Sequence, residues 1–588
     1  MDRTFAPLAA LAASLALASC ATSLPPRDGV PMFDTITASE HRQGDDLLTA
    51  GLGADGLRSM APPGFADAAR PTSEELRRRA IWGSWRGIAD LSPAGGFGEV
   101  YGSLAAVPGR EYATLATLPG ARQPQRVLAQ VPDAFDQGKR CLVVTVASGS
   151  RGVHGAMALG AAWGLPRGCA VVHSDKAAGS DYFDLDAGLG FAADGQVVPA
   201  DQASAFVPSS LEGQGVAFKH AHSQDNPEAD WGRHVRQAAE FGLQALERAF
   251  PQAGGFTFAD TRVIAVGISN GGGAVLRAAE LEGDWLDGVV AGEPNVFVDA
   301  HGGRSLYEYA SEAALLMPCA LPALGLPPVP HAEATCNALA ERGQLQGADL
   351  ATRQQSALEM LRSSGWSDAA LRGGASSVQF DLWRSVLAAY ASSYARAPHD
   401  AHPCGYRYVA GDPGQPRPAT AAERAAWWSD ASGIPPGNGV QLVDPPEGMI
   451  AGLTCLAGLA STNGPVTDGI ARTRAAPPRE GLPVIVVHGT DDGLIPMAFS
   501  SQPYVAAARA AGREHVRMWQ VRNAQHFDAF LAFPPMAAAY VPLLPYVYEA
   551  LDQLEAHLDG KGPLPDDAVF APVPRAQRAL QRADLRLR

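Results

Sequence analysis

The chain lacks several features that mark whole classes of protein. It has no basic stripe, and with 46 Lys and Arg against 61 Asp and Glu its formal net charge is -15, which argues against a nucleic-acid partner. No two of its seven cysteines have the C-x-x-C spacing of a zinc site. We find no internal repeat, no low-complexity tract and no phosphate-cradling or nucleotide-binding motif. We therefore expect neither a metal nor a cofactor.

A long hydrophobic run is also missing. The apolar stretch at residues 5–17 is too short to span a membrane as a mature helix, and it ends in Leu17-Ala18-Ser19-Cys20, which resembles a bacterial lipobox. We expect residues 1–19 to be a lipoprotein-type signal peptide, Cys20 to be the lipid attachment site and residues 20–45 to be a tether. The alternative is a secretory signal cut nearby, with Cys20 incidental. Either way the chain is exported, as a periplasmic or outer-membrane lipoprotein or else secreted, and it meets a membrane only through this anchor.

Export changes what the other cysteines imply. Six remain after Cys20, and an oxidising compartment permits disulfides among them in 15 connectivities. Cys141 and Cys169 each begin an apolar strand, and these strands would be neighbours in the fold argued below. A bridge between them is one prediction; the alternative is a pair of buried free cysteines.

The most informative motif is Gly267-Ile268-Ser269-Asn270-Gly271, which follows the apolar run at residues 263–266 and precedes a helical stretch. This is the strand–turn–helix context of a nucleophile elbow, in which the serine hydroxyl is exposed on a sharp turn. The alternative is an ordinary glycine-rich strand–helix connection. Partners for Ser269 must decide between the two.

The partners follow in the order Ser, acid, His that is found in α/β-hydrolases. The apolar strand near residue 484 leads into Asp491-Asp492, and the strand at residues 516–521 is followed by His526. A serine hydroxyl needs an imidazole to take its proton, and the imidazole needs a carboxylate to orient it. Asp492 has the position of the acid in the H-G-x-x-D-x-x-V-P pattern of many hydrolases, which makes Asp491 a solvated neighbour. We predict a triad of Ser269, Asp492 and His526.

Strands that alternate with helices predict an α/β fold, namely the α/β-hydrolase doubly wound, mostly parallel sheet. Residues 46–300 and 482–560 would form its two parts. The loop at residues 148–152 follows a buried strand, where such enzymes place half of the oxyanion hole; Ser150 is our choice there, and the N–H of Asn270 is the other half.

The 222 residues between Ser269 and Asp492 exceed what the sheet needs. We expect residues 301–481 to be a large, mainly helical lid insertion over the site. The alternative is a domain that adds bulk or mediates assembly. Residues 561–588 end in several arginines and are expected to be a solvated tail.

Four segments together resemble the D-(-)-3-hydroxybutyrate oligomer hydrolase family, over about residues 33–557. They are Ala147-Ser148-Gly149-Ser150-Arg151-Gly152, then Phe218-Lys219-His220-Ala221-His222-Ser223 with Asn226-Pro227-Glu228 and Asp230-Trp231-Gly232, then the Ser269 motif, and Ala524-Gln525-His526-Phe527-Asp528-Ala529-Phe530. The resemblance implies a serine ester hydrolase that acts through an acyl-enzyme on short oligo-esters released from poly(3-hydroxybutyrate), with a small-molecule oligoester as its partner. It carries the nucleophile onto Ser269. The lipobox departs from the family, which is usually secreted.

Other readings remain. His220 and His222 either reach the site or, as we favour, brace the core. A prolyl-oligopeptidase-like serine peptidase would carry a propeller or comparable repeat domain, which we do not find. Another exported carboxylesterase would share the same site, whereas a non-enzymatic hydrolase-fold binding protein usually lacks a triad member.

Overall fold

The computed structural model describes residues 32–429, 433–437 and 439–587. The predicted signal peptide and Cys20 therefore lie outside the described residues. Within the described part of the chain, no helix combines the length and the apolar character needed to cross a membrane.

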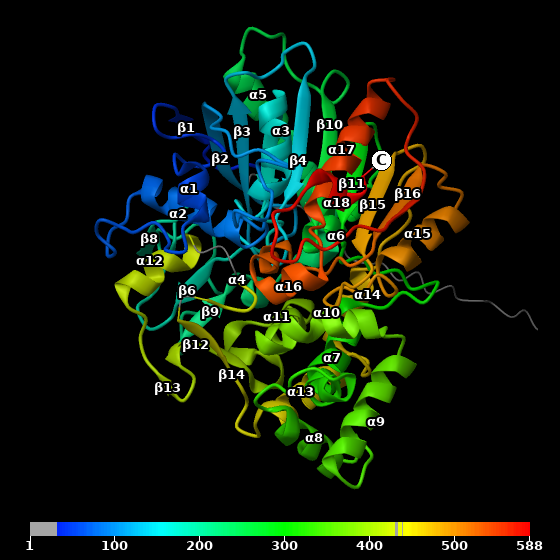
Figure 1. The fold of residues 1–588 in the computed structure, drawn as a ribbon. Helices are drawn as coiled ribbons and strands as arrows, with labels where there is room; N and C mark the ends of the chain where they lie inside the picture. Colours follow the sequence, from blue (N-terminus) through cyan, green and yellow to red (C-terminus); the bar gives the residue numbers. More distant parts are fainter. Residues whose placement is uncertain (1–31, 430–432, 438, 588) are drawn as a thin grey trace, which may run out of the picture.

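The core is a ten-stranded sheet in the order β1-β2-β3-β5-β4-β10-β11-β15-β16-β17, drawn in the upper half of Figure 1. The seven strands from β5 to β17 in this order run parallel, and β1, β2 and β3 pair antiparallel at one edge. The strands are β1 (Thr37–His41), β2 (Gly109–Ala116), β3 (Gln125–Pro132), β4 (Cys141–Val146), β5 (Ala170–Ser174), β10 (Arg262–Ile268), β11 (Gly288–Gly292), β15 (Val484–Gly489), β16 (Val516–Val521) and β17 (Ala568–Phe570). The predicted α/β-hydrolase fold class is confirmed.

Helices cover both faces of this sheet because its central strands are buried on both sides. On one face, Val144, Ala265 and Val289 pack with α5 (Trp231–Ala249), α6 (Asn270–Ala278) and α15 (Ser501–Ala510). On the other face, Val143, Ile264 and Val290 pack with α2 (Ser73–Arg86) and α17 (Leu544–Leu558). Shorter helices on the core are α1 (Gly53–Arg58), α3 (Ala162–Gly164), α16 (Pro534–Ala539) and α18 (Arg582–Leu585), whereas α4 (Lys219–His222) contacts the helix at Leu382–Ala395.

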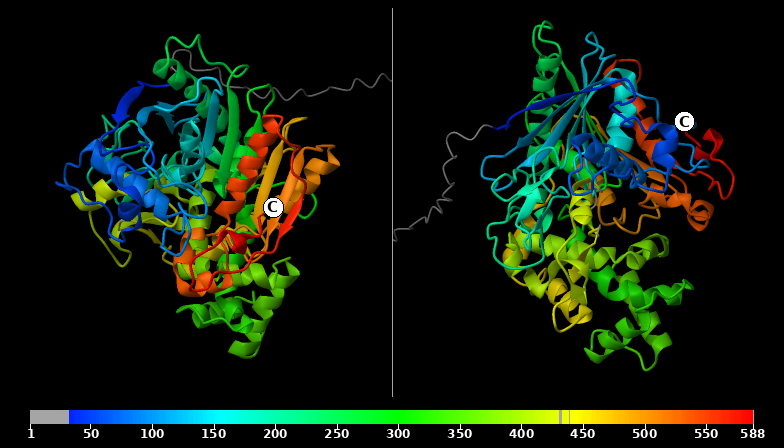
Figure 2. Two further views of the ribbon diagram at one scale, coloured as in Figure 1. Left: turned by 45° about the horizontal axis from the view of Figure 1, so that its top comes forward. Right: turned by 90° about the vertical axis from the view of Figure 1, so that its left-hand side faces the viewer.

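A cap lies at the end of the sheet where the parallel strands finish, in the lower half of Figure 1 and in both views of Figure 2. Its helices are α7 (Leu306–Ala320), α8 (Ala332–Glu341), α9 (Leu350–Ser363), α10 (Asp368–Gln379), α11 (Leu382–Ala395), α12 (Ala421–Ser429), α13 (Met449–Gly458) and α14 (Pro465–Arg472). Most residues of α11 are buried, among them Trp383, Leu387, Tyr390 and Tyr394, which recur at helical spacing. Most of this cap comes from the predicted insertion.

The cap also contains a small sheet that the sequence analysis missed. Its strands run in the order β13-β12-β9-β6-β7-β8, with β14 paired to β12. They are β6 (Tyr182–Asp184), β7 (Leu189–Phe191), β8 (Val197–Pro199), β9 (Val216–Phe218), β12 (Arg407–Asp412), β13 (Gln415–Pro416) and β14 (Val440–Val443). Because β9 pairs with β12, residues 182–218 join the insertion although we assigned them to the first part of the core.

Both predicted terminal boundaries need correction. β1 pairs with β2 along its whole length, so residues 37–41 belong to the sheet and not to a tether. β17 pairs with β16, and the buried guanidinium of Arg575 donates to Asp90, so residues 561–588 are not a solvated tail. Both segments join the edges of the sheet through hydrogen bonds between backbone groups. A short strand held in this way needs few apolar side chains, so its sequence shows little of the apolar pattern that predicts a strand.

Three disulfides join the six cysteines that lie within the described residues. Cys141–Cys169 links the starts of two neighbouring strand segments, with a Cα–Cα distance of 4.7 Å, and this confirms the pair we considered. Cys319–Cys336 and Cys404–Cys455 both lie within the cap.

Candidate active site

The Ser269 motif forms a tight turn between β10 and α6. Ser269 has φ +56° and ψ -124°, a conformation that costs a non-glycine residue energy and persists only where its surroundings enforce it. A Cβ on Gly267 would lie 2.2 Å from the backbone of Gly271, and one on Gly271 would lie 2.3 Å from the carbonyl oxygen of Val146. The glycines are thus required by the close approach of strand and helix.

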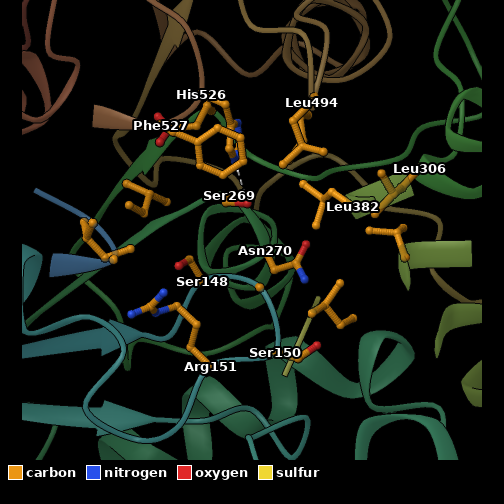
Figure 3. Close-up of a pocket in the computed structure, with 18 of the residues that line it drawn as sticks. Ser148, Ser150, Arg151, Ser269, Asn270, Leu306, Leu382, Leu494, His526 and Phe527 are labelled. Carbon is orange, nitrogen blue, oxygen red and sulfur yellow. Dashed lines mark hydrogen bonds between the residues drawn. The ribbon is translucent and has the colours of Figure 1, made fainter. Parts of the chain in front are cut away.

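The structure brings Ser269, His526 and Asp492 together (Figure 3 shows the first two). His526 Nε2 lies 3.1 Å from Ser269 Oγ, and its Nδ1 lies 2.7 Å from Asp492 Oδ2. The three residues follow β10, β15 and β16, whose carboxyl ends meet at one edge of the sheet. This geometry allows a proton to pass from the serine to an imidazole held by a carboxylate.

Asp492 is placed as an ionised hydrogen-bond acceptor. Burial by itself raises the pKa of its carboxyl, but the charge interaction with His526 and the hydrogen bonds to His488 and His526 outweigh burial, so the pKa lies below its usual range. Its other oxygen accepts from the N–H groups of Leu494 and Ile495. Asp491 is partly exposed and accepts from the Thr490 hydroxyl instead.

His488 is buried inside β15. Its Nδ1 lies 2.7 Å from Ser501 Oγ, and its Nε2 lies 2.9 Å from the carbonyl oxygen of Ile495. Both ring nitrogens are therefore engaged in holding the loop that carries Asp492.

The loop after β4 lies beside Ser269, where Ser148, Ser150 and Arg151 line the same pocket (Figure 3). The Ser150 hydroxyl is 2.5 Å from His220 Nδ1, so any donor it supplies to an oxyanion is its backbone N–H. Asn270 is the first residue of α6, where amide groups have no partner within the helix. The backbone N–H groups of Asn270 and Ser150 therefore remain predicted donors to the oxyanion.

Two buried residues, Lys176 and His220, hold this loop through hydrogen bonds. Lys176 Nζ donates to the carbonyl oxygens of Ala147 and Gly149, at 2.7 and 2.6 Å, and burial lowers its pKa to about 7. His220 is fully buried and holds Ser150, whereas His222 lies 3.0 Å from His402 Nδ1. Both histidines thus brace the interior, as we favoured. Lys176 was missed because a single lysine after a strand carries no sequence signal.

A buried polar network ties the elbow to the cap. The Asn270 amide donates to Tyr390 Oη on α11 at 2.6 Å, and the Asn295 amide donates to both Asn270 Oδ1 and Glu228 Oε1 at 3.0 Å. Tyr394, one turn further along α11, donates to the other oxygen of Glu228. Burial raises the pKa of Glu228 to about 7. Two of these residues had a sequence signal: Asn270 as part of the Ser269 motif, and Glu228 as part of the family resemblance.

The pocket at Ser269 occupies about 900 Å³ including its open mouth. The cap supplies a largely apolar wall that consists of Leu306, Leu382, Val386, Tyr390 and Ile434. The insertion therefore contributes directly to the site. Among the described residues, the group spaced to hold a metal is Cys141, Cys169 and Glu555, and its two sulfurs are joined in a disulfide.

Comparison with known proteins gives consistent matches over nearly the whole chain. Residues 28–586 match the family described as 3HB-oligomer hydrolase. A D-(-)-3-hydroxybutyrate oligomer hydrolase from Cupriavidus metallidurans is 35% identical, over 93% of this chain and 86% of that protein. A protein of the same name from Burkholderia pseudomallei is also 35% identical, over 92% and 89%. Feruloyl esterase B from Aspergillus oryzae is a similar solved structure, with 12% identity, a TM-score of 0.40 and coverage of 94% and 90%.

Proposed function

The chain belongs to the 3HB-oligomer hydrolase family and is a carboxylic ester hydrolase, and we propose that it cleaves D-(-)-3-hydroxybutyrate oligomers to monomers with Ser269, His526 and Asp492. The observation that carries the catalytic assignment is the pair of contacts from the His526 ring, 3.1 Å to Ser269 Oγ and 2.7 Å to Asp492 Oδ2. The relatives' names supply the substrate.

In this proposal the reaction has two halves. Ser269 Oγ attacks the ester carbonyl carbon while its proton passes to His526 Nε2, and Asp492 stabilises the imidazolium that results. Backbone N–H groups at Asn270 and Ser150 stabilise the oxyanion of the tetrahedral intermediate. Its collapse expels the alcohol end of the substrate, which takes the proton from His526. Water then attacks the acyl-enzyme by the same route and frees the acid and Ser269.

The substrate is tested by product analysis. Purified protein should hydrolyse soluble 3-hydroxybutyrate dimer and trimer rapidly and act little on crystalline polymer, because the cap walls the pocket with side chains such as Leu306 and Leu382. The Ser269→Ala variant should lose several orders of magnitude in kcat without loss of folding. A serine-directed organophosphonate should label the wild type alone. Faster release from polymer granules than from trimer would overturn the substrate, and labelling of both proteins would overturn the nucleophile.

The location is proposed from the sequence alone. The mature protein is held at a membrane surface by a lipid on Cys20, which follows the lipobox-like Leu17-Ala18-Ser19. The Cys20→Ser variant should leave the membrane fraction with oligomer turnover unchanged. Fractionation of wild type and variant alike into the soluble export fraction would replace the anchor by an ordinary secretory signal.

A further inference from the structure

Arg151 places a positive charge in the pocket that holds Ser269. It directly follows Ser150, and both residues line the pocket (Figure 3). Its Nη2 donates to the carbonyl oxygens of Gly83 and Ser84, at 3.1 and 3.4 Å, near the C-terminal end of α2. A Cβ on Gly87 would lie 2.2 to 2.3 Å from Nη2 and Nη1, so this glycine leaves the space that the guanidinium occupies.

None of the carboxylates in the described part of the chain neutralises this guanidinium. Among the described residues Arg151 makes no ion pair, and its buried Nε has no hydrogen-bond partner. The buried arginines elsewhere are paired: Arg126 contacts Asp181, and Arg575 contacts Asp90. Burial lowers the pKa of Arg151 to about 10, so it stays charged at neutral pH. Arg151 is partly buried, and a partly buried charge without a counterion is costly, which makes this end of the pocket a receptor for an anion.

Two carboxyl groups share the pocket and must be weighed against that charge. Burial raises the pKa of Glu293 well above its usual range, which favours the uncharged form of this carboxyl. Burial also raises the pKa of Asp528 to about 7, and its two oxygens already accept from the N–H groups of Leu543 and Leu544. Lys176 lies close enough for the Arg151 charge to depress its pKa, after the larger effect of burial. The local balance at neutral pH thus favours an anionic ligand.

A linear oligomer of a hydroxy acid carries one free carboxylate, and it always lies on the alcohol side of the scissile ester. In the last unit only two carbon atoms separate the ester oxygen from the carboxylate carbon. A guanidinium pairs with a carboxylate through two parallel N–H bonds. On the basis of the proposed function, we propose that Arg151 binds the free carboxylate of the oligomer, so that the enzyme cleaves the ester nearest the carboxyl end.

The experiment compares the 3-hydroxybutyrate dimer as free acid with its methyl ester, which has the same scissile bond and no charge. Arg151→Gln should lower kcat/KM for the acid by about 30-fold or more, chiefly through KM, and change the methyl ester by less than about 3-fold. Arg151→Lys keeps the charge but cannot form two parallel N–H bonds to one carboxylate. Its kcat/KM for the acid should lie between those of the wild type and Arg151→Gln. The control Arg86→Gln removes a charge from the same end of α2, outside the pocket. It should leave kcat/KM unchanged for both the acid and the methyl ester.

A second variant separates binding from folding. Gly87→Ala keeps Arg151 but displaces its guanidinium, and it should show the same selective loss on the acid. A trimer labelled in its carboxyl-terminal unit should release labelled monomer first. Equal losses on acid and ester, or labelled dimer as the first product, would show that Arg151 only holds α2 and would overturn the proposal.

Failure of the proposed function has a different signature. If the oligomers are not substrates, wild-type protein will hydrolyse neither the acid nor its methyl ester. Binding of a carboxylate at Arg151 is then measured in a second assay, in which 3-hydroxybutyrate inhibits the hydrolysis of p-nitrophenyl acetate by the protein. That inhibition should weaken at least about 10-fold in Arg151→Gln. Unchanged inhibition in this assay would overturn the site independently of the substrate.

Discussion

At the scale of single residues, the site depends on which of two adjacent carboxylates faces His526. Asp492 is buried and accepts from the N–H groups of Leu494 and Ile495, which fixes its orientation. Asp491 points to Thr490. A loop of this kind can present either side chain, so burial and hydrogen bonding decide the assignment.

Asp492→Asn should reduce kcat by about 10⁴, because an amide favours the wrong imidazole tautomer. Asp491→Asn, the matched control one residue away, should change kcat by less than about 3-fold, because its partner is a hydroxyl outside the triad. Steady-state kinetics on the dimer would measure both. If the two losses were reversed, the acid would have to be reassigned.

Glu228 should make stability depend on pH. Burial raises its folded-state pKa from 4.5 to about 7, so the protonated form is favoured in the folded state. Its stabilising contribution is therefore complete below pH 4.5 and is lost as the pH rises through about 7. Glu228→Gln cannot ionise and should remove this fall, worth up to about 3 kcal/mol, which unfolding experiments at pH 5 and pH 8 would measure.

The control for this titration is Glu247→Gln on α5, which removes an exposed carboxyl from a neighbouring part of the fold. It should leave the pH dependence of unfolding as it is in the wild type. The same fall in the Glu228→Gln protein as in the wild type would mean that another group titrates over this range.

At the scale of elements, the strand–turn–helix unit is held in place because the backbone of α6 lies in close contact with the backbone of β4. The carbonyl of Val146 at the end of β4 faces Gly271 in the first turn of α6, and Asn270 in the same turn is bonded to Tyr390 on α11. One helix start is therefore fixed both by the sheet and by the cap. Distortion at this point moves the nucleophile and the cap together.

Gly271→Ala should be strongly destabilising, by about 3 kcal/mol or more, because a Cβ 2.3 Å from a carbonyl oxygen forces strand and helix apart. Activity of any folded fraction should fall as well, since Ser269 moves with the helix. Gly562→Ala, where a Cβ would meet nothing within 4 Å, is the control and should change little. Thermal unfolding and dimer hydrolysis would be measured together. Wild-type behaviour of the Gly271 variant would contradict the packing described here.

At the scale of the whole molecule, one sheet carries Ser269, Asp492 and His526, and a composite cap walls the pocket. The cap draws on residues 182–218 and on the insertion, and it contains two of the three disulfides. Cys404–Cys455 closes a long loop, with a sequence separation of 51, between the small-sheet region and α13. Its main effect is to restrict the unfolded chain, because loop closure costs more entropy in longer loops.

Replacing Cys404 and Cys455 together by serine should lower the free energy of unfolding by about 2–4 kcal/mol. Thermal unfolding of the purified protein would show the loss as a lower midpoint. The oxidised wild-type protein, unfolded in denaturant, should expose no titratable thiol among the six paired cysteines. Free thiols in that assay, or an unchanged midpoint in the double variant, would contradict the pairing.

The sequence by itself determined the fold class and brought Ser269, Asp492 and His526 into a single hypothesis. Apolar β-branched strands, strict glycine spacing and chain order leave local signals that need no coordinates. The same holds for the buried face of α11, whose residues recur at helical spacing. These signals are local because each follows from steric or periodic constraints within one element.

Only the tertiary structure decided the rest. The small sheet, the edge strands β1 and β17 and the disulfide pairing depend on contacts between segments far apart in the chain. So do the support of the Ser150 loop by Lys176 and His220, and the uncompensated charge of Arg151. A buried polar residue acquires its partner and its pKa from its surroundings, and those surroundings exist only once distant parts of the chain have packed together.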